Sequence, residues 1–407
     1  MGHWKTVAIC LVILAALWDL FLDALSLRSE RNPTPENVKD VYDAEEYQKW
    51  RQYHREGIIA DSTFDGIDSI ITLLLIIFNV PAIIAASLNN TYWAAIAVLL
   101  ADTIIRFAPH TIHEFIDTMV IEQKYGFNRT TKQTFWADQA KNFAISLILT
   151  GVLLCMLIAL HQALGDKMVV LFAALLFALV LFLAFLSPYF MKIFNKFTPL
   201  EDGELKSKLT ALLEKNGYQV KEIKVMDASR RSTKSNAFFT GFGKTKTIVL
   251  FDTLLENSTI DEICAVFAHE MGHGIHKDTL KNQILAFGEV IIISLLAWLL
   301  VRYPKLHQVF GFQSVNYGMA LFLLSYCILP VISPLIGLVS NWRSRRAEYR
   351  ADKKAAEEGY GEALISALKK LSRENFANLA PDPLVVKLAY SHPTLSQRIQ
   401  AIHQKDA

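Results

Sequence analysis

The chain has 407 residues, of which 52% are hydrophobic and only 20% are charged. Soluble domains carry about a quarter charged residues and disordered chains carry far fewer apolar ones, so this composition excludes a disordered chain and argues against a wholly soluble one. The formal net charge is only +2 and no basic cluster is present, which argues against nucleic-acid binding. The four cysteines are widely scattered, so the sequence predicts neither a disulfide framework nor a cysteine metal site.

Seven apolar stretches approach or reach the roughly 20 residues that a helix needs to cross a hydrocarbon core of about 30 Å. They are Val7–Leu25, Ile70–Leu88, Tyr92–Phe107, Phe143–Leu164, Met168–Phe190, Ile284–Val301 and Met319–Val339. The first could instead be a cleaved signal peptide, because Ala24-Leu25-Ser26 resembles a cleavage site. Asp19 and Asp23 lie inside it, however, and the sequence favours a retained membrane helix.

Seven crossings would place the two termini on opposite sides of the membrane. The side that holds the N-terminus carries four lysines and arginines in its connections. The two shorter connections on the other side, residues 26–69 and 106–141, carry eleven. Positive charges favour the cytoplasm, so the side that holds the longer polar segments is predicted to be cytoplasmic.

The polar segments predict a small α/β unit on that side. We expect helices at 201–216, 260–282, 341–359, 361–373 and 393–403, and short strands at 219–226 and 236–252, with Gly241 and Gly243 at the turn. The predicted organisation is therefore 1–192 for the first five spans, 193–283 for the first part of a catalytic unit, 284–340 for the last two spans, and 341–407 for its second part. The fold class is mainly α and integral to the membrane.

The most informative run contains the pattern H-E-x-x-H, formed by His269, Glu270 and His273. Positions i and i+4 share one face of a helix, so both histidines could bind one zinc ion. Glu270 lies beside them and could take a proton from zinc-bound water. The alternative is a surface helix with incidental histidines.

A zinc site of this kind needs a third protein ligand. Glu348 lies 75 residues beyond His273 on a predicted helix, and Asp352 lies one turn further along the same face, where it could accept a hydrogen bond from a ligand histidine. On its own, the helix that carries Glu348 and Asp352 would be interpreted as a solvated charged face. The predicted helix with His269 and His273 makes Glu348 the favoured third ligand. His276 is the rival ligand.

Three segments resemble the CAAX prenyl protease type 1 family, and two shorter ones also fit. They are residues 235–254, 266–273, 346–352, 120–128 and 391–393. The resemblance implies seven helices around a large chamber and a gluzincin-like cytoplasmic catalytic domain with a small β-hairpin or sheet. It implies one Zn²⁺ per chain, bound by His269, His273 and Glu348, with Glu270 as the base.

The resemblance also implies further residues at the site. Asn236 and His392 would stabilise the transition state near the scissile carbonyl, which suits their hydrogen-bond donors. Read without the family, Asn236 would be a turn residue and His392 a helix-entry residue. The strand formed by Ala237, Phe238, Phe239 and Thr240 could pair with an extended substrate, although it could equally be an ordinary hairpin.

The substrate that the resemblance implies is a prenylated protein, from which the last three residues are removed. The sequence is shorter than eukaryotic members and its last residues carry no dilysine signal, which favours a bacterial member and leaves open a quality-control protease that acts on unmodified membrane proteins. The expected location is therefore a bacterial inner membrane or the endoplasmic reticulum membrane. The expected partners are the bilayer and a peptide or prenylated protein substrate, with no obligate protein partner.

Several charged or titratable residues lie inside the predicted membrane spans. A charge at a helix centre costs about 2.5–3.5 kcal/mol on insertion scales, so Asp102 and Arg106, one turn apart, are expected to pair and face an aqueous interior. Glu289 is expected to face inward likewise, and His161 to lie near the membrane interface. A transporter would also carry such charges, but it has no use for zinc ligands and no internal repeat is visible. An inactive scaffold would be expected to carry a broken zinc motif.

Overall fold

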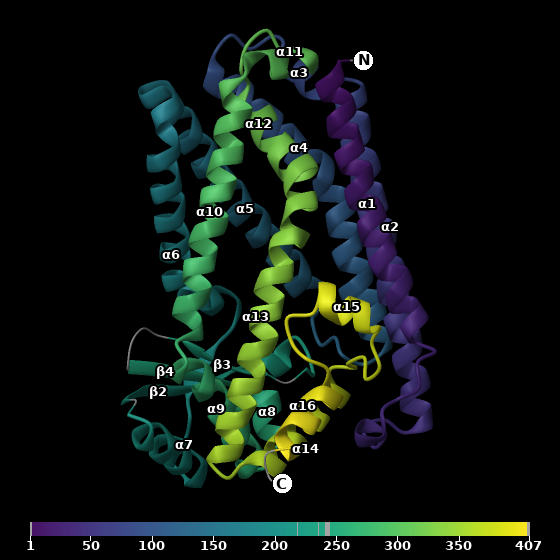
Figure 1. Ribbon diagram of the computed structural model, residues 1–407, viewed down its shortest axis with the longest axis vertical. Coiled ribbons are helices and arrows are strands. Elements are labelled where there is room, and N and C mark those ends of the chain that lie inside the picture. Colours follow the sequence, from purple (N-terminus) through teal and green to yellow (C-terminus); the bar gives the residue numbers. More distant parts are fainter. Residues whose placement is uncertain (1, 218, 235, 241–244, 405–407) are drawn as a thin grey trace.

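The computed structural model describes residues 2–217, 219–234, 236–240 and 245–404. Long helices form the upper part of the molecule in Figure 1, and a small sheet with short helices forms the lower part. The chain begins at the upper end, and the last described helix lies at the lower end. The first and last described residues therefore lie at opposite ends of the long axis.

The upper part consists of helices that run roughly along the long axis (Figure 1). The long ones are α1 (His3–Ser29), α2 (Ala44–Ile77), α4 (Thr91–Phe115), α5 (Lys132–Leu164), α6 (Met168–Phe194), α10 (Asp278–Arg302) and α13 (Leu329–Glu357). Shorter ones are α3 (Val80–Ala85), α11 (Pro304–Val309) and α12 (Tyr317–Leu323). Two π-helical segments, η2 (Ile116–Glu122) and η5 (Leu324–Ile328), continue α4 and α12, and 3₁₀ turns occur at η1 (Glu36–Val38), η3 (Gly165–Lys167) and η4 (Ala228–Arg230).

Five helical segments of the described chain are long and apolar enough to cross a membrane: His3–Ser29, Thr91–Glu122, Lys132–Leu186, Asp278–Arg302 and Tyr317–Glu357. The third of these contains α5 and most of α6, two of the predicted spans, which η3 joins. Large apolar side chains on these helices are exposed on the protein surface, including Ile148 at 65% and Val170 at 76%. A soluble protein rarely exposes so much apolar surface, which indicates contact with lipid.

One predicted stretch is not a continuous helix. Residues 70–88 are divided between α2 and α3, because Asn79 adopts a left-handed conformation with φ of 52°. Lys5 of α1 donates hydrogen bonds to the Ile77 carbonyl and to Asn79 Oδ1 at 2.8 and 3.0 Å. A buried lysine thus satisfies acceptors that the helix end leaves free.

The sheet has four strands in the order β1-β2-β4-β3. They are β1 (Phe197–Pro199), β2 (Gln219–Met226), β3 (Ala237–Thr240) and β4 (Thr245–Phe251). The expected hairpin is present as the antiparallel pair of β3 and β4, whereas β1 and the parallel pairing of β2 with β4 were not predicted. Gly241 and Gly243, the predicted turn residues, lie outside the described residues. Because β3 is an edge strand, one side of it is free of sheet pairing within the described chain.

The remaining helices are α7 (Glu204–Lys215), α8 (Asp252–Asn257), α9 (Ile260–Ile275), α14 (Gly361–Glu374), α15 (Pro383–Leu388) and α16 (Leu395–His403). The first three contact the sheet, and α14 packs against α9. A second hydrophobic core, separate from that of the membrane helices, packs around α9 and includes Ile263, Phe267 and Ile399. The predicted single helix over 260–282 is wrong, because Lys277 has φ of 54° and separates α9 from α10.

A cavity of about 830 Å³ lies between the membrane helices. Asp102 and Arg106 both line it, and Arg106 Nε donates to Asp102 Oδ1 at 2.9 Å. Glu289 is half-buried on α10 and is not among the residues that line this cavity. His161 bonds the Tyr317 hydroxyl at 2.8 Å, which gives its ring a partner within the helix bundle.

Candidate active site

The H-E-x-x-H motif lies on α9, whose start is defined by a capping box. Thr259 accepts from the backbone N–H of Glu262, and the Glu262 carboxylate accepts from the N–H of Thr259. These reciprocal bonds satisfy two donors that a helix N-terminus leaves free. The apolar face of α9 is buried in the lower core, so the orientation of the opposite face, with its histidines, is set by packing.

Gly272, between the two histidines, permits a close approach of α13. A Cβ atom at this position would lie 2.8 Å from the Cα of Ala351, a backbone atom that cannot move aside without shifting α13. Ala351 follows Glu348 by three residues on the same helix. The absence of a side chain at Gly272 therefore brings Glu348 within reach of the histidine pair.

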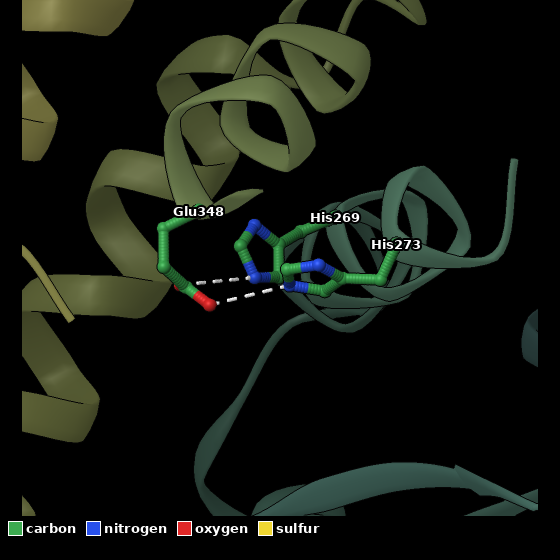
Figure 2. Close-up of side chains that lie close together, drawn as sticks. All are labelled: His269, His273 and Glu348. Atoms are coloured by element: carbon green, nitrogen blue, oxygen red, sulfur yellow. Dashed lines mark ion pairs between the residues drawn. The ribbon is translucent and has the colours of Figure 1, made fainter. Parts of the chain in front are cut away.

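Three side chains from these two helices converge on one point. His269 Nε2 lies 3.5 Å from Glu348 Oε2, and His273 Nε2 lies 3.3 Å from Glu348 Oε1 (Figure 2). Donor atoms of all three residues lie within 4.8 Å of one another. His269 and Glu348 are buried, while His273 is partly exposed.

This donor set fits a zinc ion. Zinc takes imidazole nitrogen and carboxylate oxygen ligands at about 2.1 Å, and two such ligands at a tetrahedral angle lie about 3.4 Å apart. The measured separations of 3.3 and 3.5 Å agree with that value. His276, the rival ligand, caps the C-terminus of α9 and is not part of the cluster found among the described residues.

Both histidines are oriented by carboxylates. His269 Nδ1 lies 2.8 Å from Asp352 Oδ1, and His273 Nδ1 lies 3.2 Å from Asp278 Oδ2. A hydrogen bond at Nδ1 fixes the tautomer that leaves Nε2 free as a ligand, an arrangement typical of zinc sites. The sequence predicted Asp352 for this role, but it did not indicate Asp278.

Two arginines hold these carboxylates and were also missed. Arg398 of α16 donates to both oxygens of Asp352, at 2.6 and 2.9 Å, and its Nη1 lies 3.3 Å from Glu348 Oε2. Arg350 donates to Asp278 at 2.9 Å. Asp278 lies only five residues after His273, and this short spacing is a weak signal that the two could be in contact. Arg398 lies 46 residues after Asp352 and further still from Glu348, so no local pattern in the sequence predicts its contacts.

Glu270 lies beside the ligands in a desolvated setting. Burial raises the pKa of its carboxyl, and the nearby histidines oppose that shift. A small void lined by Ala237, Ile263, Phe267 and Glu270 separates α9 from the sheet. A carboxyl with a raised pKa beside a metal site is suited to accept and return a proton.

The structure places the other predicted site residues around this cluster. His392 Nε2 lies 3.5 Å from Glu348 Oε1, and its Nδ1 lies 2.9 Å from Ser391 Oγ. Asn236 is exposed at the start of β3, where its Oδ1 accepts from the backbone N–H of Ala237 at 2.8 Å. The backbone of β3 is described, but the side chains of Phe238, Phe239 and Thr240 lie outside the described residues.

The comparison with known proteins decides the family. Residues 199–406 match peptidase family M48, and residues 23–196 match the family described as CAAX prenyl protease N-terminal, five membrane helices. The chain belongs to peptidase family M48. It is therefore a membrane-embedded, multi-pass protease, and the resemblance to CAAX prenyl proteases is confirmed.

Relatives of this M48 peptidase match over almost its whole length. The CAAX prenyl protease 1 homolog of Oryza sativa subsp. japonica is 31% identical, covering 98% of this chain and 97% of its own. The probable CAAX prenyl protease 1 of Schizosaccharomyces pombe is also 31% identical, covering 98% of this chain and 88% of its own. The crystal structure of S. mikatae Ste24p superposes with a TM-score of 0.91 at 27% identity, covering 99% of both chains.

Proposed function

We propose that this M48 peptidase is a zinc-dependent endopeptidase whose active site is formed by α9, α13 and the C-terminal helices. His269, His273 and Glu348 would hold the ion, and their converging donor atoms are the observation that carries the proposal. Zinc, when bound there, supplies a Lewis acid that polarises the scissile carbonyl and acidifies water.

The chain's own residues account for the remaining chemistry. Glu270 accepts a proton from the attacking water and returns it to the leaving amine, a role that its place next to His269 and the raised pKa of its partly buried carboxyl support. His392 and Asn236 donate hydrogen bonds to the carbonyl oxygen as negative charge develops on it. The free edge of β3 pairs with the extended substrate backbone and presents it to Glu270.

The topology that we propose has seven crossings, with the catalytic end in the cytoplasm. The five apolar segments give six crossings, because one of them contains both α5 and α6. The additional crossing, second along the chain, is formed by α2 together with α3. Lysines and arginines are concentrated in the connections at the catalytic end. In the domain organisation that follows, 1–192 and 284–340 form the membrane part, and 193–283 with 341–407 form the catalytic part.

The substrate class that we propose is a prenylated C-terminal tail. The support comes from the relatives, which are named CAAX prenyl proteases and match along the whole chain. The cavity between the membrane helices, lined by both polar and apolar side chains, offers space for a lipid-modified substrate.

A comparison of two versions of one peptide tests this substrate class. The purified protein in nanodiscs is given a CAAX peptide with and without a farnesyl group, and cleavage products are identified by mass. We expect release of the last three residues with a kcat/KM at least tenfold higher for the farnesylated peptide. Equal rates would overturn the prenyl selectivity and leave a quality-control protease that acts on unmodified chains.

A further inference from the structure

The segment that leads into the active-site strand begins at Ser229 and reaches Lys234, two residues before Asn236. It begins within the 3₁₀ turn η4 and leads toward β3. The position of this segment therefore sets where Asn236 and the edge of β3 lie relative to Glu270.

Lys234 makes an ion pair with a residue of the membrane part. Its Nζ lies 2.7 Å from Glu122 Oε1 and 3.1 Å from the Tyr53 hydroxyl, which itself donates to the same Glu122 oxygen at 2.8 Å. The Glu122 side chain is only 15% exposed and that of Lys234 is 33% exposed. This pair is therefore more shielded from water than an ordinary surface ion pair. Fully exposed ion pairs contribute little to stability.

The partners of Lys234 come from two helices of the membrane part. Tyr53 lies on α2, and Glu122 is the last residue of the π-helical segment η2. π-Helical turns are rare and occur frequently at functional sites. The chain immediately after Glu122 also pairs with the segment, since the Thr233 N–H donates to the Phe127 carbonyl at 3.1 Å and the Arg129 N–H donates to the Arg231 carbonyl at 2.9 Å.

On its other side the segment is bound to α8, and Asn236, two residues further on, is bound to the sheet. Thr253 Oγ1 donates to the Lys234 carbonyl at 3.1 Å, and the Phe251 N–H donates to the Asn236 carbonyl at 3.1 Å. The segment is thus held between the membrane part and the catalytic part. Two of its side chains link it to the membrane part: Lys234 pairs with Glu122, and Arg231 donates to Asp138 of α5 at 2.9 Å.

We propose that Tyr53, Glu122 and Lys234 form a positioning cluster that holds Asn236 and β3 in register with the active site. The proposal rests on the role given to Asn236 under the proposed function. Loss of the Lys234 cation leaves the shielded Glu122 carboxylate without its cation and removes the attachment to the membrane part that lies nearest Asn236, which loosens this end of the segment. Because a displacement of about 1 Å can cost about 100-fold in rate, kcat falls while substrate binding is largely kept.

The test uses the full-length protein and a cleavable peptide. We expect Lys234→Met and Glu122→Gln each to lower kcat by about 10–100-fold with KM changed less than threefold, and Lys234→Arg to retain most of the activity. The matched control is Lys124→Met, which removes an exposed ion pair with Glu56 beside the cluster and should leave kcat unchanged.

A double-mutant cycle tests whether the cluster acts through Asn236. In the Asn236→Ala background, Lys234→Met should add no further loss of kcat. Multiplicative losses, an unchanged kcat in Lys234→Met, or an Asn236→Ala protein with full activity would each overturn the positioning role.

A measurement without turnover separates this proposal from the proposed function. Backbone amides of residues 229–234 should exchange hydrogen at least tenfold faster in Lys234→Met than in the wild type, with those of α9 unchanged. If the wild type cleaves no peptide, the proposed function fails, but this exchange comparison still tests the cluster. Equal exchange rates of residues 229–234 in Lys234→Met and in the wild type would contradict the positioning cluster.

Discussion

Asp278 lies directly after the left-handed Lys277 that ends α9, and this turn brings its carboxylate back to His273. Arg350 from α13 bonds the other oxygen of the carboxylate. Residues of two helices, α9 and α13, therefore hold the Asp278 carboxylate at the active site. From the sequence alone, Asp278 would be taken only as the first residue of a helix.

Removal of the Asp278 carboxylate should weaken metal binding. We expect Asp278→Ala to lower zinc affinity by about 10–100-fold, because His273 loses the acceptor that fixes its ring. Metal competition with a chromophoric chelator measures the affinity. Asp261→Ala is the control, since this exposed residue of α9 pairs only with Lys208 among the contacts of the described chain, and the proposal fails if both variants bind zinc equally.

Glu262, the capping residue of α9, gives a pH-dependent prediction. Burial would raise the pKa of its carboxyl, but hydrogen bonds from Lys370, Ser366 and the Thr259 N–H lower that pKa to about 2. An unfolded glutamate titrates near 4.3, so the stabilisation is complete above that pH and is lost as the pH falls toward 2.

We expect Glu262→Gln to lower the free energy of unfolding by about 1–3 kcal/mol at pH 7, because charged hydrogen bonds are lost. The difference in Tm from the wild type should shrink as the pH falls from about 4.5 toward 2. Thermal unfolding in detergent across that range measures it, with Glu204→Gln as the control for an exposed ion pair. A difference in Tm that stays constant with pH would show that the charge of Glu262 is not what stabilises the helix.

At the scale of elements, the contact of α9 with α13 creates the site. Gly272→Ala would place a methyl group 2.8 Å from the Ala351 Cα, so the two helices must separate. We expect at least a tenfold loss of zinc affinity, measured by metal content after dialysis. Gly288→Ala on α10 is the control, because nothing lies within 4 Å of its added Cβ, and zinc retention in both variants would contradict the account.

The elements also show what a sequence can predict. His269, Glu270 and His273 could be placed together because their spacing lies within one helix. Glu348 could be favoured only because the histidine pair needs a third ligand, since tertiary packing rather than sequence spacing brings it to α9. The predictions of continuous helices at 70–88 and 260–282 were wrong because Asn79 and Lys277 adopt left-handed conformations. Neither residue is a glycine, so nothing in the sequence indicated a break at these positions.

Other parts of the structure depend on distant contacts. Arg398 reaches Asp352 from the last described helix, and β2 pairs directly with β4 in parallel although β3 lies between them in the sequence. Neither leaves a periodic pattern, because both result from packing between segments far apart in the sequence. The charged pair of Asp102 and Arg106 was predictable, since residues four apart on a helix must meet if neither can face lipid.

At the scale of the whole molecule, the bilayer orientation that we propose rests on the chain's charges and on seven crossings. Seven crossings require Lys305, in the connection before α12, and His403, at the end of α16, to lie on opposite sides. We expect a cysteine at 403 to react with an impermeant maleimide from the cytoplasmic side of sealed vesicles, and one at 305 only from the other side. The experiment uses a background in which the four native cysteines are replaced, and labelling of both from one side would contradict seven crossings.

The central claim is that Glu270 moves protons at a zinc site formed by His269, His273 and Glu348. The most direct measurement combines zinc content with peptide cleavage in the wild type and in Glu270→Gln. The account predicts about one zinc per chain in both proteins and a loss of kcat of at least 1,000-fold in the variant. Cleavage by Glu270→Gln at the wild-type rate, or a wild type that cleaves after its zinc has been removed, would contradict it.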